Sequence, residues 1–157
     1  MVSIQAEGLA KQPTLIINVN DSSLGRPPLY RDIQLGYFSY HYRESTEMAS
    51  IGFPAVSAKL QLPNGTKYGF VHIKPTENKP YLLLCHGFPS SSYDWRHQIK
   101  HFAGKGYGVL APDLLGYGDT DKPSNPSAYR LKKMCEEVTA ILDSLKIDRV
   151  VGVAHDW

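Results

Sequence analysis

The C-terminal end of this 157-residue sequence reads Val150-Val151-Gly152-Val153-Ala154-His155-Asp156-Trp157. Its first five residues are apolar or small, a short run that is typical of a buried strand. The polar pair His155-Asp156 then interrupts the run, which indicates a sharp turn from a strand into a helix. Asp156 would lie at that turn, near the free backbone N–H groups of a helix N-terminus, and these favour an ionised carboxylate.

Two roles are open for Asp156. The simpler one is a cap for the helix that follows, which is a common use of Asp after a strand. The chemical one is a nucleophile, because an ionised carboxylate needs no general base and can displace a leaving group at a saturated carbon to form an ester. A serine there would need a histidine to take its proton, so Asp156 argues against an ordinary esterase or lipase. We predict that Asp156 is a nucleophile, and strand alternation points the His155 side chain away from it.

The loop His86-Gly87-Phe88-Pro89 follows a short apolar run over 81–85 that predicts a second buried strand. One interpretation is an ordinary turn, in which Gly87 and Pro89 supply the bend. The other is an oxyanion hole, in which the backbone N–H of Phe88 stabilises charge that develops on Asp156. The N–H of Trp157, directly after the nucleophile, would then be the second donor.

Strand and helix patterns alternate along the sequence from residue 57. An Asn64-Gly65 pair between apolar residues predicts a hairpin turn with positive φ at both positions. Apolar residues at spacings of four and three predict a helix that places Trp95 in the core. The fold class is therefore α/β, a β-hairpin followed by βαβαβ in a mostly parallel sheet. The elements expected after the hairpin are a strand over 81–85, a helix over 95–102, a strand over 107–114, a helix over 128–146 and the strand that ends at Ala154.

The helix over 128–146 is expected to be amphipathic. Most of its charged residues, Glu137 among them, are expected to lie away from the apolar face. In the preceding loop, Asp113 is expected to cap a turn or to bind Arg96, and Asp119 and Asp121 are expected to be loop carboxylates. The expected apolar face consists of Leu131, Met134, Val138, Ile141, Leu142 and Leu145.

Composition limits the class of protein. Hydrophobic residues make up 42% and charged residues 20%, which is ordinary for a globular protein. A net charge of +2 with scattered Lys and Arg gives no indication of nucleic-acid binding. No run approaches the roughly 18 apolar residues of a membrane span, and the N-terminus lacks a signal-peptide pattern. The cysteines Cys85 and Cys135 fit neither a disulfide framework nor a metal site, so we expect a cytoplasmic protein without metal or cofactor. Nothing in the sequence assigns an oligomeric state.

Residues 1–56 carry no recognisable motif and are expected to form an N-terminal extension of unknown function, with the α/β core over 57–157. A short apolar run over 15–19 is consistent with a strand, whereas composition and terminal position favour loose order for the extension as a whole. Met48 offers an alternative start of the chain.

Four motifs within residues 57–157 resemble, in order, those of the epoxide hydrolase branch of the α/β-hydrolase fold. The sequence departs from the family only in the last motif, where Ala154 replaces a glycine. The small size of alanine keeps that difference minor. The motifs are His86-Gly87-Phe88-Pro89, Ser92-Tyr93-Asp94-Trp95-Arg96-His97-Gln98, Pro112-Asp113-Leu114-Leu115-Gly116-Tyr117-Gly118 and Ala154-His155-Asp156-Trp157.

This resemblance implies a mechanism. In the family an Asp opens the epoxide while two cap-domain tyrosines bind its oxygen, and a His oriented by a second acid activates water to split the ester. Asp156 would be the nucleophile, the N–H groups of Phe88 and Trp157 the oxyanion hole, and a small apolar epoxide and water the substrates. The tyrosines, the His and the second acid lie beyond residue 157 in the family. We therefore expect a partial core, truncated before the cap and C-terminal half, with one strand edge unpaired, poor solubility and no turnover alone.

Other families share part of this pattern. Haloalkane dehalogenases have the same fold and an Asp nucleophile, but often carry Gln before it and Asn or Glu in place of Phe88. His155 and Phe88 therefore favour an epoxide hydrolase, and Trp157 argues against fluoroacetate dehalogenases, which have Arg there. A non-catalytic remnant or binding fragment is the remaining alternative, and the genomic sequence after the Trp157 codon distinguishes it from an enzyme.

Overall fold

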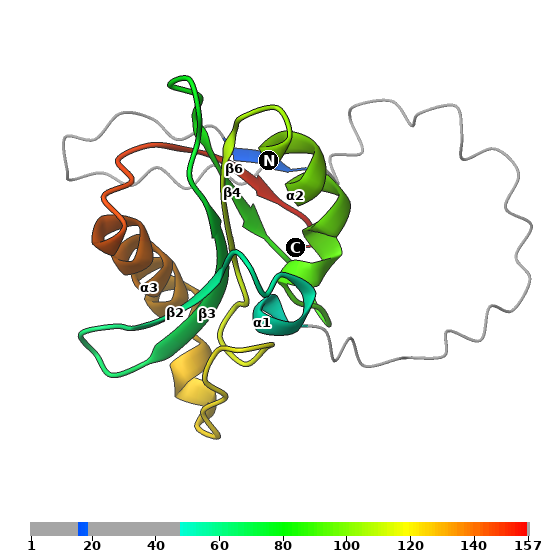
Figure 1. The fold of residues 1–157 in the computed structure, drawn as a ribbon. Coiled ribbons are helices and arrows are strands. Elements are labelled where there is room, and N and C mark those ends of the chain that lie inside the picture. The colour runs from blue at the N-terminus through cyan, green and yellow to red at the C-terminus, as the bar shows by residue number, and fades with distance from the viewer. Residues whose placement is uncertain (1–15, 19–47, 157) are drawn as a thin grey trace, which may run out of the picture.

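The computed structural model describes residues 16–18 and 48–156. One sheet joins the strands of these residues in the order β1-β6-β4-β5-β3-β2. Helix α3 covers one face of this sheet, and helices α1 and α2 cover the other (Figure 1). The elements are β1 (Ile16–Asn18), α1 (Ala49–Gly52), β2 (Ser57–Gln61), β3 (Lys67–Ile73), β4 (Tyr81–Cys85), the 3₁₀-helix η2 (Ser92–Trp95), α2 (Arg96–Ala103), β5 (Gly108–Pro112), the 3₁₀-helix η3 (Pro126–Tyr129), α3 (Leu131–Ser144) and β6 (Val150–Ala154).

The centre of the sheet is parallel. Strand β4 pairs in parallel with both β5 and β6, whereas β3 runs antiparallel to β2 and to β5. This arrangement confirms the predicted hairpin followed by βαβαβ. Strand β1 pairs in parallel with the outer side of β6, with Ile17 opposite Val153. The expected strand within residues 15–19 is therefore present, and the expectation that an edge of β6 stays unpaired is wrong over residues 152–154.

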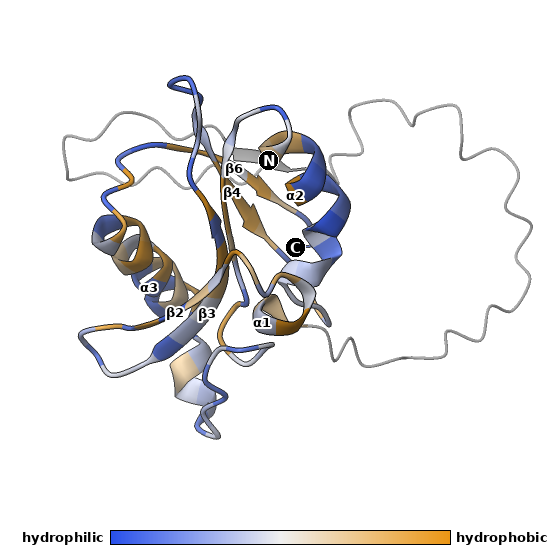
Figure 2. Cartoon of the chain, viewed as in Figure 1, coloured by the Kyte–Doolittle hydropathy of each residue, from blue (hydrophilic) through white to orange (hydrophobic). Residues whose placement is uncertain are grey.

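Alternation along the strands divides the apolar side chains between two cores. In β4, Leu82 and Leu84 face α1 and α2, whereas Leu83 faces α3. In the same way Leu110 of β5 lies on the α3 side, opposite to its neighbours in the strand. Both β4 and β6 are apolar, as expected for strands covered on both faces (Figure 2). The first core also contains Ala49 of α1, which is fully buried, while the domain division at residue 57 stays a prediction.

The hairpin turn differs from the predicted two-residue type. Gly65 has a φ of +87°, but Asn64 is not among the described residues with positive φ. The Gly65 N–H donates to Leu62 O and the Leu62 N–H donates to Thr66 O, which makes Pro63 and Asn64 the centre of a turn that Gly65 completes. Pro63 favours this longer form, because its fixed φ suits the first central position of a type I turn.

The long amphipathic helix predicted over 128–146 is interrupted near its start. Arg130 adopts an extended conformation, with φ −68° and ψ 126°, and separates η3 from α3. Asn125 caps η3 by accepting the Ser127 N–H, and Tyr129 donates its hydroxyl to Pro123 O. These local bonds hold the first turn apart from α3, so Leu131 is 66% exposed rather than part of the apolar face.

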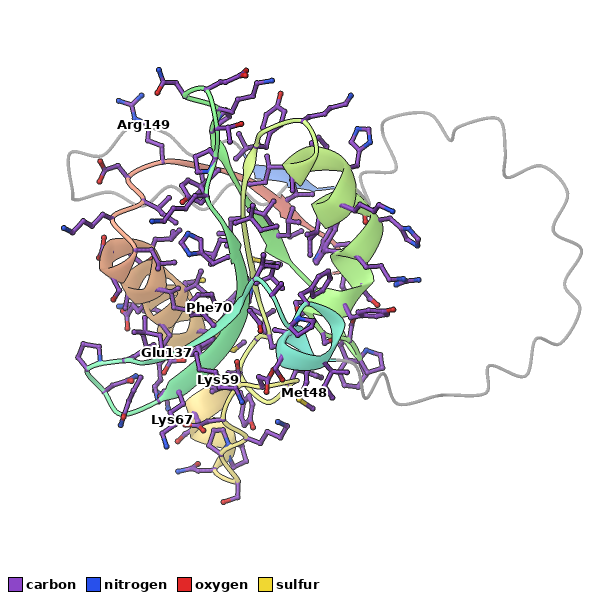
Figure 3. The ribbon with its side chains drawn as sticks, viewed as in Figure 1. Met48, Lys59, Lys67, Phe70, Glu137 and Arg149 are labelled. Carbon is purple, nitrogen blue, oxygen red and sulfur yellow. The ribbon has the colours of Figure 1, made fainter. Side chains whose placement is uncertain are left out.

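Glu137 is the main exception to the predicted pattern of α3, because it is buried rather than exposed. Its carboxylate accepts hydrogen bonds from Asn64 Nδ2 at 2.8 Å, from Thr66 Oγ1 at 3.2 Å and from the Tyr68 hydroxyl at 2.9 Å. Burial and the neighbouring Glu137 carboxylate raise the pKa of Tyr68, which stays a hydroxyl donor. Glu137 therefore ties α3 to the β2–β3 hairpin, beside which it lies in Figure 3.

Replacing Glu137 by Ala should lower the free energy of unfolding by about 3 kcal/mol, because it leaves three donors without their acceptor. Chemical denaturation followed by circular dichroism measures the change. The matched control is Glu136→Ala on the exposed side of the same turn, which should change stability by less than about 0.5 kcal/mol. Equal losses in the two variants would contradict the role of Glu137.

None of the helices within residues 48–156 has the length and apolar sequence that crossing a bilayer requires.

Candidate active site

Two loops meet where β4 and β6 end. These strands are parallel neighbours, with Cys85 opposite Ala154, so the residues after each strand leave the sheet at the same edge. In open α/β sheets this carboxyl edge is the usual position of a ligand site. It brings the loop from His86 to Pro89 beside the turn at His155 and Asp156.

Asp156 has a φ of +76°, a left-handed conformation that is uncommon outside glycine. Such a strained residue after a strand is the geometry of a nucleophile elbow. The Phe88 N–H donates to Asp156 Oδ2 at 2.7 Å, across 68 residues of sequence. A bond of this length to a carboxylate is charge-assisted, and it fixes one of the two oxygens. Trp157, the other predicted donor, lies outside the described residues.

Gly87 permits this close approach. A Cβ at Gly87 would lie 2.4 Å from Asp156 Cβ, 2.8 Å from Asp156 Oδ2 and 2.9 Å from His155 Cε1. The Phe88–Pro89 peptide is cis, and the Phe88 side chain is 75% exposed beside the Tyr117 ring. Phe88 therefore contributes its backbone to the Asp156 carboxylate while its ring faces solvent.

Replacing Gly87 by Ala should slow reactions of the Asp156 carboxylate with an electrophile by about 100-fold, because the new methyl group must push the loop and the turn apart. Intact-mass kinetics of adduct formation, normalised to the folded fraction, measures this effect. The control is Gly104→Ala at the end of α2, where φ is −62° and the nearest atom, Lys100 O, is 3.2 Å from the added Cβ. Unchanged kinetics in Gly87→Ala would contradict the close packing described here.

His86 is buried beneath the loop, with 3% of its surface exposed. Its Nδ1 lies 2.8 Å from Gly87 O, and its Nε2 lies 2.8 Å from the Leu114 N, which follows β5. The Tyr117 ring packs edge-on against the imidazole, with centroids 5.3 Å apart. No role for His86 was predicted from the sequence, although its place as the first polar residue after a buried strand was a signal that could have marked it.

His155 packs against η2, and its ring also borders Gly87 of the loop. Its ring lies 5.4 Å from the Trp95 ring, and its Nε2 lies 3.8 Å from Asp94 Oδ2. Trp95 is 5% exposed, which confirms its predicted place in the core. These contacts support a structural role for His155 in holding the turn against η2.

Asp113 is another buried polar group, and one of the two roles predicted for it is correct. Its carboxylate accepts N–H bonds from Ala49 at 3.1 Å, Ser92 at 2.8 Å and Asp119 at 2.9 Å. It therefore caps turns, as one alternative held. The other alternative, an ion pair with Arg96, is wrong. The Arg96 guanidinium donates to Tyr93 O and lies over the Tyr93 ring.

The two other loop carboxylates attach the loop to the hairpin. Asp119 accepts from the Ser50 N–H and forms an ion pair of 2.7 Å with Lys59, while Asp121 accepts from the Lys67 N–H. Burial raises the pKa of Asp119, but the bonds from Lys59 and Ser50 more than offset that effect, so its pKa lies below the ordinary value.

Acid should destabilise the fold through His86, which is buried, and His72, which is half-buried. Burial lowers the pKa of His86 and of His72, and the Lys74 charge adds to the effect at His72. The unfolded chain then binds more protons than the folded one, so stability is complete above the ordinary histidine pKa of about 6.5 and falls as the pH drops below it. Chemical denaturation at pH 7.5 and pH 5.5 tests this, and equal or greater stability at pH 5.5 would contradict it.

An open surface pocket of about 350 Å³ is separate from this site. It is lined by residues such as Thr66, Lys122 and Lys133, and by neither Asp156 nor Phe88. Residues 16–18 and 48–156 contain no group of three or more His, Cys, Asp or Glu side chains arranged to hold a metal ion.

Comparison with known proteins identifies the family to which this fold and site belong. The family model of the alpha/beta hydrolase fold matches residues 80–157. Epoxide hydrolase 3 of Siraitia grosvenorii is 44% identical over 94 residues, which are 60% of this chain and 29% of that protein. Bifunctional epoxide hydrolase 2 of Mus musculus is 36% identical over 124 residues, or 73% of this chain and 22% of that protein. The chain thus spans less than a third of the length of these relatives.

Solved structures give the same result. An epoxide hydrolase of Vigna radiata is 40% identical with a TM-score of 0.58, over 64% of this chain and 32% of that one. Epoxide hydrolase A of Mycobacterium thermoresistibile is 32% identical with a TM-score of 0.58, over 64% and 31% of the two chains. With the hairpin, the parallel strands and the turn at Asp156 in place, the chain belongs to the epoxide hydrolase family of the α/β-hydrolase fold and corresponds to the N-terminal portion of its members.

Proposed function

We propose that this chain carries the nucleophile of an epoxide hydrolase, Asp156, and the oxyanion-hole loop that serves it. The observation that supports the proposal most directly is the 2.7 Å bond from the Phe88 N–H to Asp156 Oδ2 at a residue with φ +76°. This bond holds one carboxylate oxygen, and Oδ1 is the oxygen left to react. The names of the curated relatives supply the substrate class, an epoxide.

In the proposed reaction, Asp156 Oδ1 attacks one carbon of a small apolar epoxide. The bond between that carbon and the epoxide oxygen breaks, the oxygen takes a proton from water, and a hydroxyalkyl ester forms on Asp156. Oδ2 then becomes the ester carbonyl oxygen and stays within reach of the Phe88 N–H. When water later adds to the ester, the charge that develops on Oδ2 is stabilised by this donor, and by the N–H of Trp157 in the proposed hole.

We also infer a cytoplasmic location for this activity, because Cys85 and Cys135 are both free thiols. Burial raises the pKa of Cys85 to about 11, so this thiol is protonated at neutral pH. Cys135 is exposed and is the competing nucleophile that an experiment must exclude.

Incubating the chain with styrene oxide tests the proposal. We expect an adduct on Asp156, located by peptide analysis, in wild type and in Cys135→Ser, and in Cys135→Ser a single mass increase equal to the mass of the intact epoxide. No adduct on Asp156 would contradict the proposal. An adduct from an alkyl halide, with loss of halide and without reaction of the epoxide, would instead assign a dehalogenase.

A further inference from the structure

His86 connects the ends of two strands through its ring. It follows β4 directly, and its Nε2 reaches the Leu114 N–H beyond the end of β5. Its Nδ1 meets the carbonyl oxygen of the next residue, Gly87. The ring is almost completely buried, so these two groups replace water as its partners.

The partners of His86 determine its tautomer. The Leu114 N–H can only donate, so Nε2 must present a lone pair. The Gly87 carbonyl can only accept, so Nδ1 must carry the proton. The neutral Nδ1–H form alone satisfies both bonds, and burial favours a neutral ring over a charged one.

The bond to Gly87 O also orients the Phe88 N–H. The carbonyl of Gly87 and the N–H of Phe88 belong to one planar peptide unit and point in opposite directions. Holding the oxygen at His86 Nδ1 therefore aims the hydrogen at Asp156 Oδ2, which lies 2.7 Å from the Phe88 nitrogen. Rotation of this peptide would break both bonds together.

We propose that His86 is a positioning residue of the oxyanion hole, whose neutral Nδ1–H form anchors the Gly87–Phe88 peptide to the end of β5 and aims the Phe88 N–H at Asp156. This inference rests on the proposed function for its catalytic consequence, but not for the geometry. Titratable groups near the ring are Asp113, Asp94 and His155. The ring itself touches no substrate atom.

The tautomer is tested in the unmodified chain by ¹⁵N NMR of its histidines. We expect His86 at neutral pH to show Nδ1 with the shift of a protonated nitrogen and Nε2 with that of an unprotonated one. An Nε2–H tautomer or a charged ring at neutral pH would overturn the proposal. This measurement needs no variant and no substrate.

Two substitutions then separate the two bonds. His86→Asn places an amide near the position of Nδ1 and can still donate to Gly87 O, whereas His86→Gln places its amide near Nε2 and can still accept from Leu114. We expect Asn to retain most of the rate of Asp156 alkylation by styrene oxide, and Gln to lose at least about 10-fold per folded molecule. His97→Gln, at an exposed position of α2, is the control and should react like wild type.

A second readout separates this inference from the proposed function. Hydrogen exchange of the Phe88 amide should accelerate in His86→Gln and stay near the wild-type rate in His86→Asn, whether or not any epoxide reacts. If wild type forms no adduct but exchange follows this order, the proposed function fails and the positioning role stands. If both variants keep wild-type exchange and alkylation, His86 has only a structural role and the inference is wrong.

Discussion

Replacing Asp156 by Asn should abolish covalent capture of styrene oxide, with a fall in the alkylation rate of at least about 10³-fold. The amide has nearly the same shape as the carboxylate, and its oxygen can still accept the Phe88 N–H. What it lacks is the negative charge that lets Oδ1 attack carbon without a general base. Time courses of intact mass in a Cys135→Ser background measure the rate.

The matched control for this prediction is Asp148→Asn, which makes the same chemical change at an exposed residue before β6 and should react like wild type. Circular dichroism of both variants ensures that folded chains are compared. An Asp156→Asn variant that forms the adduct at the wild-type rate would remove Asp156 from the reaction and, with it, the proposed function.

Replacing Asp113 by Asn should cause the largest loss of stability, about 3–5 kcal/mol, and lower the melting temperature by about 10 °C. The Asp113 carboxylate is completely buried, and its two oxygens accept N–H bonds from α1, from η2 and from the following loop. An amide offers one oxygen in place of two and turns its own N–H groups toward backbone donors. Close packing against Gly118, whose added Cβ would overlap the carboxylate, leaves the amide no room to turn away.

The comparison for Asp113 is Asp121→Asn, an exposed residue of the same loop whose carboxylate accepts one backbone bond, from the Lys67 N–H at 2.8 Å. Its loss should stay below about 1 kcal/mol. Chemical denaturation of the two variants gives both numbers. Similar small losses would mean that Asp113 does not hold the three segments together.

The predictions that succeeded from sequence rest on local patterns and on the chain order of the strands and helices. Alternation and apolar runs located the strands, and parallel βαβ units place the loop after β4 beside the turn after β6. The hydrogen bond from the Phe88 N–H to Asp156 Oδ2 is a consequence of that topology. The failures were equally local in origin: Pro63 selected a different hairpin turn, and bonds at Asn125 and Tyr129 separated η3 from α3.

The buried polar groups could not be predicted from such patterns. Glu137 was expected to be exposed because its side chain is charged. Its hydrogen-bond donors are about 70 residues earlier, in the hairpin. Asp113 bonds to Ala49, which is 64 residues away, and not to Arg96. A hydrogen-bonding group shows in the sequence that it needs a partner, but not which distant backbone group folding will bring to it.

The sequence by itself determined the order of elements, the α/β class and the place of Asp156 in the polar turn after β6, because side-chain periodicity and turn residues act over a few positions. Only the tertiary structure decided that Ile16–Asn18 pairs with β6, that Asp113 and Glu137 are shared acceptors, and that His86 fixes the Gly87–Phe88 peptide. These features depend on which segments meet when the two cores are buried, and the hydrophobic effect that buries them has no direction of its own. Hydrogen bonds between distant segments are directional, so they determine which polar groups pair when these segments meet.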